Sequence, residues 1–308
     1  MKLVNYYVSN FANSSRVGFI LNGQVIDVQH AYQKWLQSQN EDASFAKVTH
    51  EMPADPNLFF SLGETVLEKA KLAYDYAKDA GITGLDREEV RLGVPIPEPR
   101  KIICVGKNYA DHAAEMDSDV PEFPVLFSKF SNALIGPDDE IEKSSATEQL
   151  DYEVELAVVI GKEATKVSRE EAADYILGFT IGNDISARDL QKRTQQWLQG
   201  KTLDRTTPIG PWVVTKDEVG DFSNLAIRSY VNGELRQQSN TGKMIFDVPY
   251  LLEFITNLIT LQPGDIILTG TPDGVGFAMN PPQFLQDGDV VTLEIENIGK
   301  MENKVVER

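Results

Sequence analysis

The stretch that most constrains this fold is QLDYEVELAVVIG, residues 149–161. Its apolar and β-branched residues predict a strand that enters a core. Asp151, Glu153 and Glu155 occupy alternate positions, so on one continuous strand they would share a face. Neighbours on that face would lie about 6.5–7 Å apart and repel each other by about 2–3 kcal/mol. Solvent, basic side chains or a divalent cation could relieve this repulsion, and the segment alone favours a solvated face.

The composition indicates a globular protein without nucleic acid or membrane partners. The 308 residues are 42% hydrophobic and 25% charged, which is ordinary for a soluble domain. A formal net charge of −18 disfavours binding to nucleic acid and to anionic membranes, and no segment is long and apolar enough for a membrane span. Cys104 is the single cysteine, lies in an apolar run and is expected to be buried and inert. We therefore expect a cytoplasmic protein.

The chain divides into two parts at a proline-rich segment, GVPIPEPRK, which forces an extended connection. Residues 1–98 are predicted to form a small α/β domain, with a hairpin around Asn22-Gly23 and a helix over 64–80. Residues 99–308 contain many short strands that do not alternate regularly with helices. This pattern predicts a β-dominated α+β catalytic domain.

A further carboxylate, Asp184, ends an apolar strand in GFTIGNDISARDLQKR. Three carboxylates completed by water are typical of octahedral Mg²⁺ or Mn²⁺ sites. The alternative is that Asp184 merely caps the helix predicted over 185–193. On that helix Arg188 and Gln191 are three residues apart and would share one face.

Two other positions could take part in chemistry. His112 and Glu115 lie three residues apart in VGKNYADHAAEM, and a histidine held by a carboxylate can act as a general base. Such a pair is more often a surface pair. Lys201 follows Trp197 in WLQGK and could stabilise an oxyanion or donate a proton, although a surface lysine is the commoner case.

Taken together, these motifs resemble the fumarylacetoacetate hydrolase family, most closely its acylpyruvate hydrolase and oxaloacetate decarboxylase branch. The resemblance runs in order from about residue 100 to the C-terminus. It rests on ICVGKNYADHAAEM, LDYEVELAVVIGK, GFTIGNDISARDLQ, WLQGKTLDRTTPIGPW, VNGELRQQSNTGKMIF and LQPGDIILTGTPDGVG. The resemblance implies a mixed β-sandwich roll and a homodimer.

The resemblance also implies which residues form the site. It implies that Mg²⁺ or Mn²⁺ is held by Glu153, Glu155 and Asp184, with Asp151 outside the ligand set. It places His112 and Glu115 on a short lid and makes Lys201 catalytic. It implies that the substrate is contacted by Arg188, Gln191 and Thr271.

The implied reaction is metal-dependent cleavage of a C–C bond in a small 2-oxo acid through a stabilised enolate. The cleavage would be hydrolysis of an acylpyruvate or fumarylpyruvate, or decarboxylation of oxaloacetate. The alternative is an isomerase, decarboxylase or hydratase that acts on hydroxymuconate-type products of aromatic catabolism, because these reactions share the same enolate.

Overall fold

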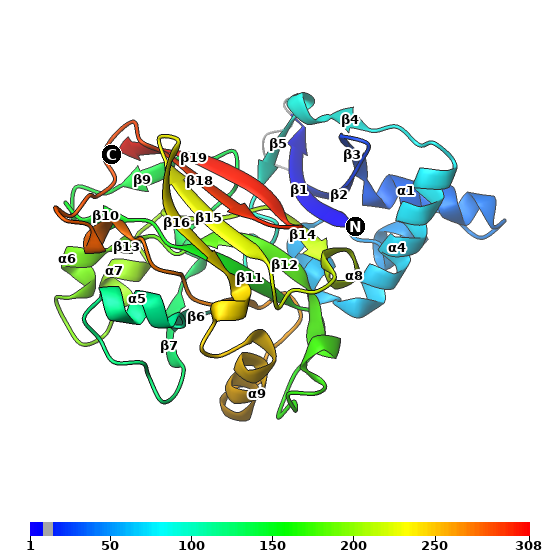
Figure 1. The fold of residues 1–308 in the computed structure, drawn as a ribbon. Helices are drawn as coiled ribbons and strands as arrows, with labels where there is room; N and C mark the ends of the chain where they lie inside the picture. The colour runs from blue at the N-terminus through cyan, green and yellow to red at the C-terminus, as the bar shows by residue number, and fades with distance from the viewer. Residues whose placement is uncertain (9–14) are drawn as a thin grey trace.

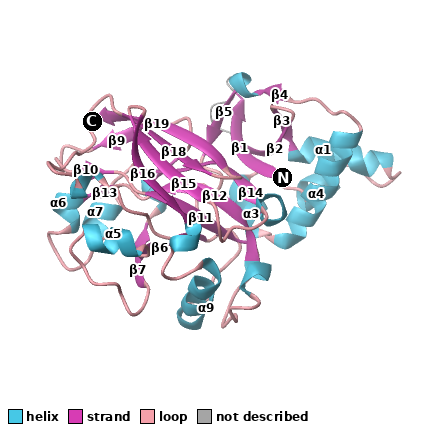
Figure 2. Ribbon diagram, in the orientation of Figure 1, coloured by secondary structure: helices cyan, strands magenta, loops and turns pink. Residues whose placement is uncertain are grey.

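The computed structural model describes residues 1–8 and 15–308, which are arranged around one large mixed sheet (Figures 1 and 2). Its central path runs β4-β3-β2-β1-β14-β12-β11-β17-β6-β7, with β5 beside β1 and β8 beside β14. The strands from the second part of the chain are β6 (Ile102–Gly106), β7 (Val125–Lys129), β8 (Leu134–Ile135), β11 (Val154–Ile160), β12 (Ile176–Asn183), β14 (Thr207–Thr215) and β17 (Ile266–Leu268).

A second, five-stranded sheet packs against the first, with the order β16-β15-β18-β19-β9. Its strands are β9 (Ile141–Lys143), β15 (Ala226–Val231), β16 (Glu234–Asn240), β18 (Val290–Ile295) and β19 (Gly299–Glu307). In Figure 1 its yellow-to-red strands lie over the green strands β11 and β12, and β15 and β18 contact them. Apolar side chains of both layers form one continuous core between the sheets. The predicted β-dominated α+β class is confirmed.

The N-terminal segment extends the large sheet, at the right of Figure 1. Its elements are β1 (Lys2–Val8), β2 (Arg16–Leu21), β3 (Gln24–Asp27), α1 (Val28–Ser38), α2 (Phe45–Glu51), α3 (Pro56–Ser61), α4 (Glu64–Asp79), β4 (Leu85–Asp86) and β5 (Val90–Gly93). The predicted hairpin and helix are present. Strand β1 pairs with β14, with Leu3 opposite Val213. A domain boundary near residue 98 stays a prediction.

Strand β11 is buried on both faces, which explains its nearly continuous apolar run. Val154, Leu156 and Val158 belong to the core between the two sheets. Ala157 and Val159 belong to a second core, which the N-terminal helices α1 and α4 help to form. Because side chains alternate along a strand, Glu155 points to the same side as this second core.

Three predictions about this region were wrong in detail. Residues 149–161 do not form one strand: β10 (Leu150–Asp151) is separate and pairs with β13 (Ser186–Ala187), and β11 begins only at Val154. The acidic residues are not solvated, since Asp151, Glu153 and Glu155 are at most 4% exposed. The helix predicted over 185–193 is reduced to α6 (Arg188–Gln191), because long-range pairing of β13 takes the residues that precede it.

The remaining helices are short, apart from one at the bottom of Figure 1. They are α5 (Ala110–Glu115), α7 (Leu198–Lys201), α8 (Lys216–Val219) and α9 (Val248–Leu258), with 3₁₀ turns η1 (Arg87–Glu89), η2 (Ser131–Ala133), η3 (Ala172–Tyr175), η4 (Thr241–Lys243) and η5 (Gly276–Ala278). Among the described residues, no helix combines the length and apolar character needed to cross a membrane.

Candidate metal centre and active site

Three buried carboxylates converge at one end of the β11–β12 pair. These strands are antiparallel, with Val154 opposite Asn183 and Glu155 opposite Gly182. The start of β11 and the end of β12 therefore meet, which brings Glu153, Glu155 and Asp184 together. One carboxylate oxygen from each of the three lies within 4.8 Å of the other two. Each of these residues is at most 4% exposed.

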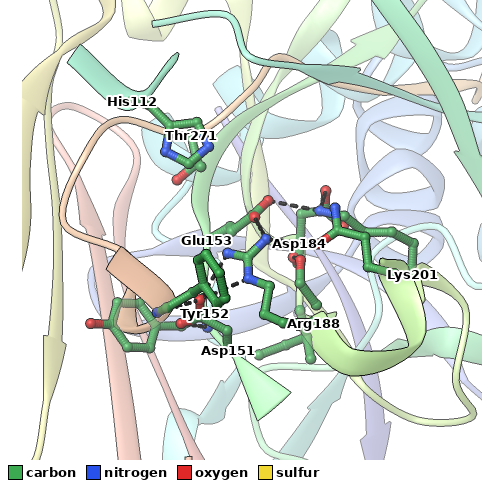
Figure 3. Close-up of polar contacts among 12 residues, drawn as sticks. His112, Asp151, Tyr152, Glu153, Asp184, Arg188, Lys201 and Thr271 are labelled. Carbon is green, nitrogen blue, oxygen red and sulfur yellow. Dashed lines mark hydrogen bonds and ion pairs between the residues drawn. The ribbon is translucent and has the colours of Figure 1, made fainter. Parts of the chain in front are cut away.

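Basic side chains surround two of the three carboxylates (Figure 3). Lys201 Nζ lies 2.8 Å from Glu153 Oε2 and 2.7 Å from Asp184 Oδ2. Lys129 Nζ donates to the other Asp184 oxygen at 2.6 Å. Arg188 Nη1 lies 2.7 Å from Glu153 Oε1. Both Lys129 and Lys201 are buried, so Lys201 is not a surface lysine.

Asp151 lies behind the cluster and anchors Arg188. The guanidinium Nε and Nη2 atoms lie 2.9 and 2.8 Å from Asp151 Oδ2. The backbone N–H groups of Gly276 and Phe277 donate to the same carboxylate. Arg188 therefore bridges Asp151 and Glu153, and Asp151 is not among the three clustered carboxylates.

Glu155 is the member of the cluster that lacks a cationic partner. Its Oε2 accepts from the backbone N–H of Gly270 at 2.8 Å, and no lysine or arginine in the described part of the chain forms an ion pair with it. Burial, together with the carboxylates of Asp184 and Glu153, raises the pKa of Glu155 well above its ordinary value. A cation bound at this point would oppose that shift, because it favours the ionised carboxylate.

Glu153 and Lys201 are held in their ionised forms. Burial opposes the charge on Glu153, yet Lys201 and Arg188 lower its pKa below the ordinary range. Burial likewise opposes the charge on Lys201, but Asp184 and Glu153 raise the pKa of its ammonium group. Lys201 therefore stays protonated at neutral pH.

The formal charges fit a divalent cation. The carboxylates of Asp151, Glu153, Glu155 and Asp184 face the cations of Lys129, Arg188 and Lys201. When all four carboxylates are ionised, they exceed the three cations by one negative charge in a buried region. Closely spaced, buried oxygen ligands with an excess negative charge suit Mg²⁺ or Mn²⁺, and Glu153, Glu155 and Asp184 are the residues able to hold such an ion.

His112 and Glu115 form a pair at the same site. On α5, His112 Nδ1 lies 2.7 Å from Glu115 Oε1, and Glu115 Oε2 accepts from the Gly274 N–H at 2.9 Å. His112 is only 6% exposed, so this is not a surface pair. Because Glu115 engages Nδ1, the Nε2 atom is the ring nitrogen left for chemistry.

One small cavity, of about 50 Å³, brings most of the predicted residues together. It is lined by His112, Glu153, Glu155, Asp184, Arg188, Gln191, Lys201 and Thr271. Glu115 does not line it but contacts His112. The individual roles of these residues stay predictions.

Thr271 is more constrained than its predicted role requires. Its hydroxyl donates to the Val154 carbonyl at 2.9 Å and accepts from Gln237 Nε2 at 2.8 Å. A hydroxyl has one hydrogen to donate, so a substrate carboxylate would have to compete with Val154. Gln237 is fully buried and also donates to the carbonyl of Pro272, and it thereby fixes the loop that carries Thr271.

Reasoning from sequence missed Lys129 and Gln237. Lys129 ends β7 in VLFSK, and Gln237 lies in the polar strand ELRQQSN. Neither stretch differs from an ordinary edge strand with solvated polar residues. Only their positions in space show that both are buried beside the site.

Comparisons with known proteins agree with this geometry. Residues 101–306 match the family described as "Fumarylacetoacetate (FAA) hydrolase C-terminal". The chain is 41% identical over 310 residues to the mitochondrial oxaloacetate tautomerase fahd2 of Xenopus laevis, covering 99% of this chain and 90% of the relative. It is 42% identical over 298 residues to the oxaloacetate tautomerase YisK of Bacillus subtilis (strain 168), covering 95% and 97%.

A solved structure shows the same architecture. It is that of maleylpyruvate hydrolase from Sphingobium sp. SYK-6 in complex with manganese (II) ion and pyruvate, with 28% identity and a TM-score of 0.75. The similarity covers 100% of this chain and 99% of that one. The resemblance inferred from the motifs is thereby confirmed, and the chain belongs to the fumarylacetoacetate hydrolase family.

Proposed function

We propose that this protein is a divalent-metal-dependent enzyme that interconverts the keto and enol forms of a small 2-oxo acid of the oxaloacetate type. The observation that carries the proposal is that three clustered carboxylates and His112 line a single buried cavity. Similarity over nearly the whole chain to two oxaloacetate tautomerases supports the choice of substrate and reaction.

The metal site is proposed to be formed by Glu153, Glu155 and Asp184. Mg²⁺ or Mn²⁺ bound there would supply Lewis acidity to a 2-oxo group. Arg188 holds Glu153 in place through Nη1, and Lys129 holds Asp184. These contacts keep the ligand carboxylates in position before any ion binds.

The proton transfers are assigned to the chain's own residues. His112 Nε2 takes a proton from C3 of the keto acid, while Glu115 orients the ring through Nδ1. Lys201, which stays protonated, places positive charge where the negative oxygen develops. The proton removed from C3 is returned to the 2-oxo oxygen, so the reaction is an isomerisation without loss of atoms.

Cleavage of a C–C bond is the second candidate. The similar maleylpyruvate hydrolase structure, which carries Mn²⁺ and pyruvate, favours it. In a hydrolase, His112 would instead take a proton from water that attacks a distal carbonyl. In a decarboxylase, CO₂ would leave from C4, and the enolate of pyruvate that results would be protonated at C3.

The quaternary structure and the compartment also belong to the proposal. We retain a homodimer on the basis of the family resemblance. A cytoplasmic location stays a prediction, and the relative from Xenopus laevis is named as mitochondrial.

The proposal is tested with metal-stripped protein to which Mg²⁺ or Mn²⁺ is added back. We expect metal to restore the conversion of enol to keto oxaloacetate, followed by ultraviolet absorbance. His112→Ala should slow turnover by about 10²–10⁴-fold while calorimetry shows nearly unchanged Mn²⁺ affinity. Equal rates with and without metal would overturn the proposal.

Parallel assays separate the two candidate functions. Pyruvate released from oxaloacetate measures decarboxylation, and the acids released from maleylpyruvate measure hydrolysis. The tautomerase proposal requires enolisation to be much faster than either release. If either release is instead faster than enolisation, the enzyme is a lyase or a hydrolase.

A further inference from the structure

One basic residue that lines the active-site cavity has no partner among the residues that the structure describes. Lys107, Arg188 and Lys201 all line the cavity. Arg188 and Lys201 are bound to carboxylates of the cluster. Lys107 makes no ion pair or hydrogen bond within residues 1–8 and 15–308. A free ammonium group beside a buried acidic cluster is a candidate for binding an anionic part of the substrate.

The backbone at Lys107 is fixed on both sides. A side chain on Gly106 would meet the Trp197 ring at 2.5 Å, so only glycine allows this close approach. On the other side, Asn108 Nδ2 donates to the carbonyls of Phe246 and Thr269 at 2.9 and 2.7 Å. The amide oxygen of Asn108 accepts from the Phe246 N–H at 2.7 Å.

Lys107 itself adopts a left-handed conformation, with φ of 57°. This region is unfavourable for a residue with a Cβ by about 1–2 kcal/mol. The tight contact at Gly106 and the bonds of Asn108 hold the backbone in it. The result is that a flexible lysine side chain starts from a rigid point at the edge of the cavity.

The formal charges show why a free cation is useful here. With all four carboxylates ionised, the cluster exceeds its three paired cations by one negative charge, and a bound divalent ion would convert this to one positive charge. That charge matches one carboxylate of a 2-oxo acid. A second carboxylate on the same substrate would be buried without compensation unless another cation were present.

The other described residues of the cavity wall supply no further cation. It is formed by apolar and aromatic residues, namely Val105, Met116, Phe127 and Trp197. The Phe127 and Trp197 rings pack edge to face with centroids 5.2 Å apart. Among the described lining residues, Lys107 is thus the one basic group not already bound to a carboxylate.

We propose that Lys107 binds the carboxylate remote from the 2-oxo group, and that it makes the site selective for 2-oxo dicarboxylic acids over monocarboxylic acids of the same length. This inference rests on the proposed enolisation of 2-oxo acids and names the substrate class of the same site.

The test compares oxaloacetate with 2-oxobutanoate, which has four carbons but a methyl group in place of the remote carboxylate. Loss of the C3 protons in D₂O, followed by NMR, reports enolisation of both acids. We expect Lys107→Met to lower kcat/KM for oxaloacetate by about 10–100-fold, mainly through KM. The value for 2-oxobutanoate should change by less than about twofold, and Lys107→Arg should retain most of the selectivity.

Binding of unreactive analogues gives a second readout that does not depend on turnover. Titration calorimetry of the Mn²⁺-loaded protein compares malate with 2-hydroxybutanoate. Lys107→Met should lower the affinity for malate by about tenfold or more and leave the affinity for 2-hydroxybutanoate unchanged. Lys192→Met is the matched control, because Lys192 lies over the Phe277 ring and does not line the cavity. Lys192→Met should change the affinity for neither ligand.

Three outcomes would overturn the inference. Equal losses of kcat/KM for both acids in Lys107→Met would mean that Lys107 maintains the structure of the site and does not select the substrate. No loss of kcat/KM for either acid would mean that Lys107 is an ordinary surface lysine. An equal effect of Lys192→Met would show long-range electrostatics. If the unaltered enzyme enolises neither acid with any metal, the proposed function itself fails, and the calorimetric comparison still decides the role of Lys107.

Discussion

Ion pairs in two regions of this molecule differ greatly in their surroundings. At the candidate metal centre, Lys129 and Asp184 are 0% and 1% exposed and lie 2.6 Å apart. Where the N-terminal helix α4 meets α8, Lys71 and Asp217 lie 2.7 Å apart but are 57% and 56% exposed. The distances are nearly equal, while solvent screens only the second pair. The distance between two charged groups alone therefore does not show how much an ion pair contributes to the stability of the fold.

The largest effect is expected for Asp184→Asn. The substitution leaves Lys129 and Lys201 buried with less opposing charge, which should lower the free energy of unfolding by about 3–5 kcal/mol. It also removes one of three candidate ligands. Denaturant unfolding and Mn²⁺ calorimetry measure both effects. If this variant kept full Mn²⁺ affinity and turnover, Asp184 would not be a ligand.

A smaller effect on function is expected for Lys129→Met. The apolar side chain keeps the volume but leaves the Asp184 oxygen without its 2.6 Å partner. As with other residues that orient metal ligands, Mn²⁺ affinity should fall by about 10–100-fold. Binding curves for Mn²⁺ measure this. Lys143→Met is a matched control, because Lys143 is also buried but bonds to Gln286, away from the cavity. Equal losses in both variants would contradict a specific role for Lys129.

The smallest effect on stability is expected at the exposed ion pair of Lys71 and Asp217. Partial burial opposes ionisation of Asp217, but hydrogen bonds from Lys71 and Thr215 lower its pKa to about 2. In the unfolded chain the pKa is about 3.9, so the stabilisation is complete above that pH and is lost as the pH falls towards 2.

Asp217→Asn should therefore lower the free energy of unfolding at neutral pH by less than about 1 kcal/mol, because solvent screens the pair. The difference from the unaltered protein should vanish near pH 2. Urea unfolding at several pH values measures it. A difference that grows towards low pH would contradict this assignment, and a difference as large as that of Asp184→Asn would remove the contrast between the two regions.

Much of the local structure could be predicted from sequence, because turn residues and the spacing of apolar residues determine it within a few neighbouring positions. The Asn22-Gly23 turn requires positive φ at both positions, 52° and 81°, and so marks its hairpin. Helix α4 follows from the spacing of its apolar residues. The ordered motifs identified the family, and with it the fold class.

The helix predicted over 185–193 shows where local reasoning ends. Arg188 and Gln191 do lie on one short helix, α6, but β13 pairs with β10, whose residues lie more than thirty positions earlier in the chain. Such a contact leaves no trace in the neighbouring residues. The same pairing separates Asp151 from the strand that carries Glu155, so the three acidic residues that alternate in sequence do not share one face.

The sequence by itself determined which groups are present: the carboxylates, a histidine three residues before a glutamate, and the apolar run that anchors Glu155. Only the tertiary structure decided which of these groups are buried and which of them form ion pairs. It buried the acidic residues, placed Lys129 beside Asp184 and, within the described part of the chain, left Lys107 and Glu155 without partners of opposite charge. The physical reason is that desolvation and ion pairing depend on groups far apart in the chain, whereas residue type and periodicity are local.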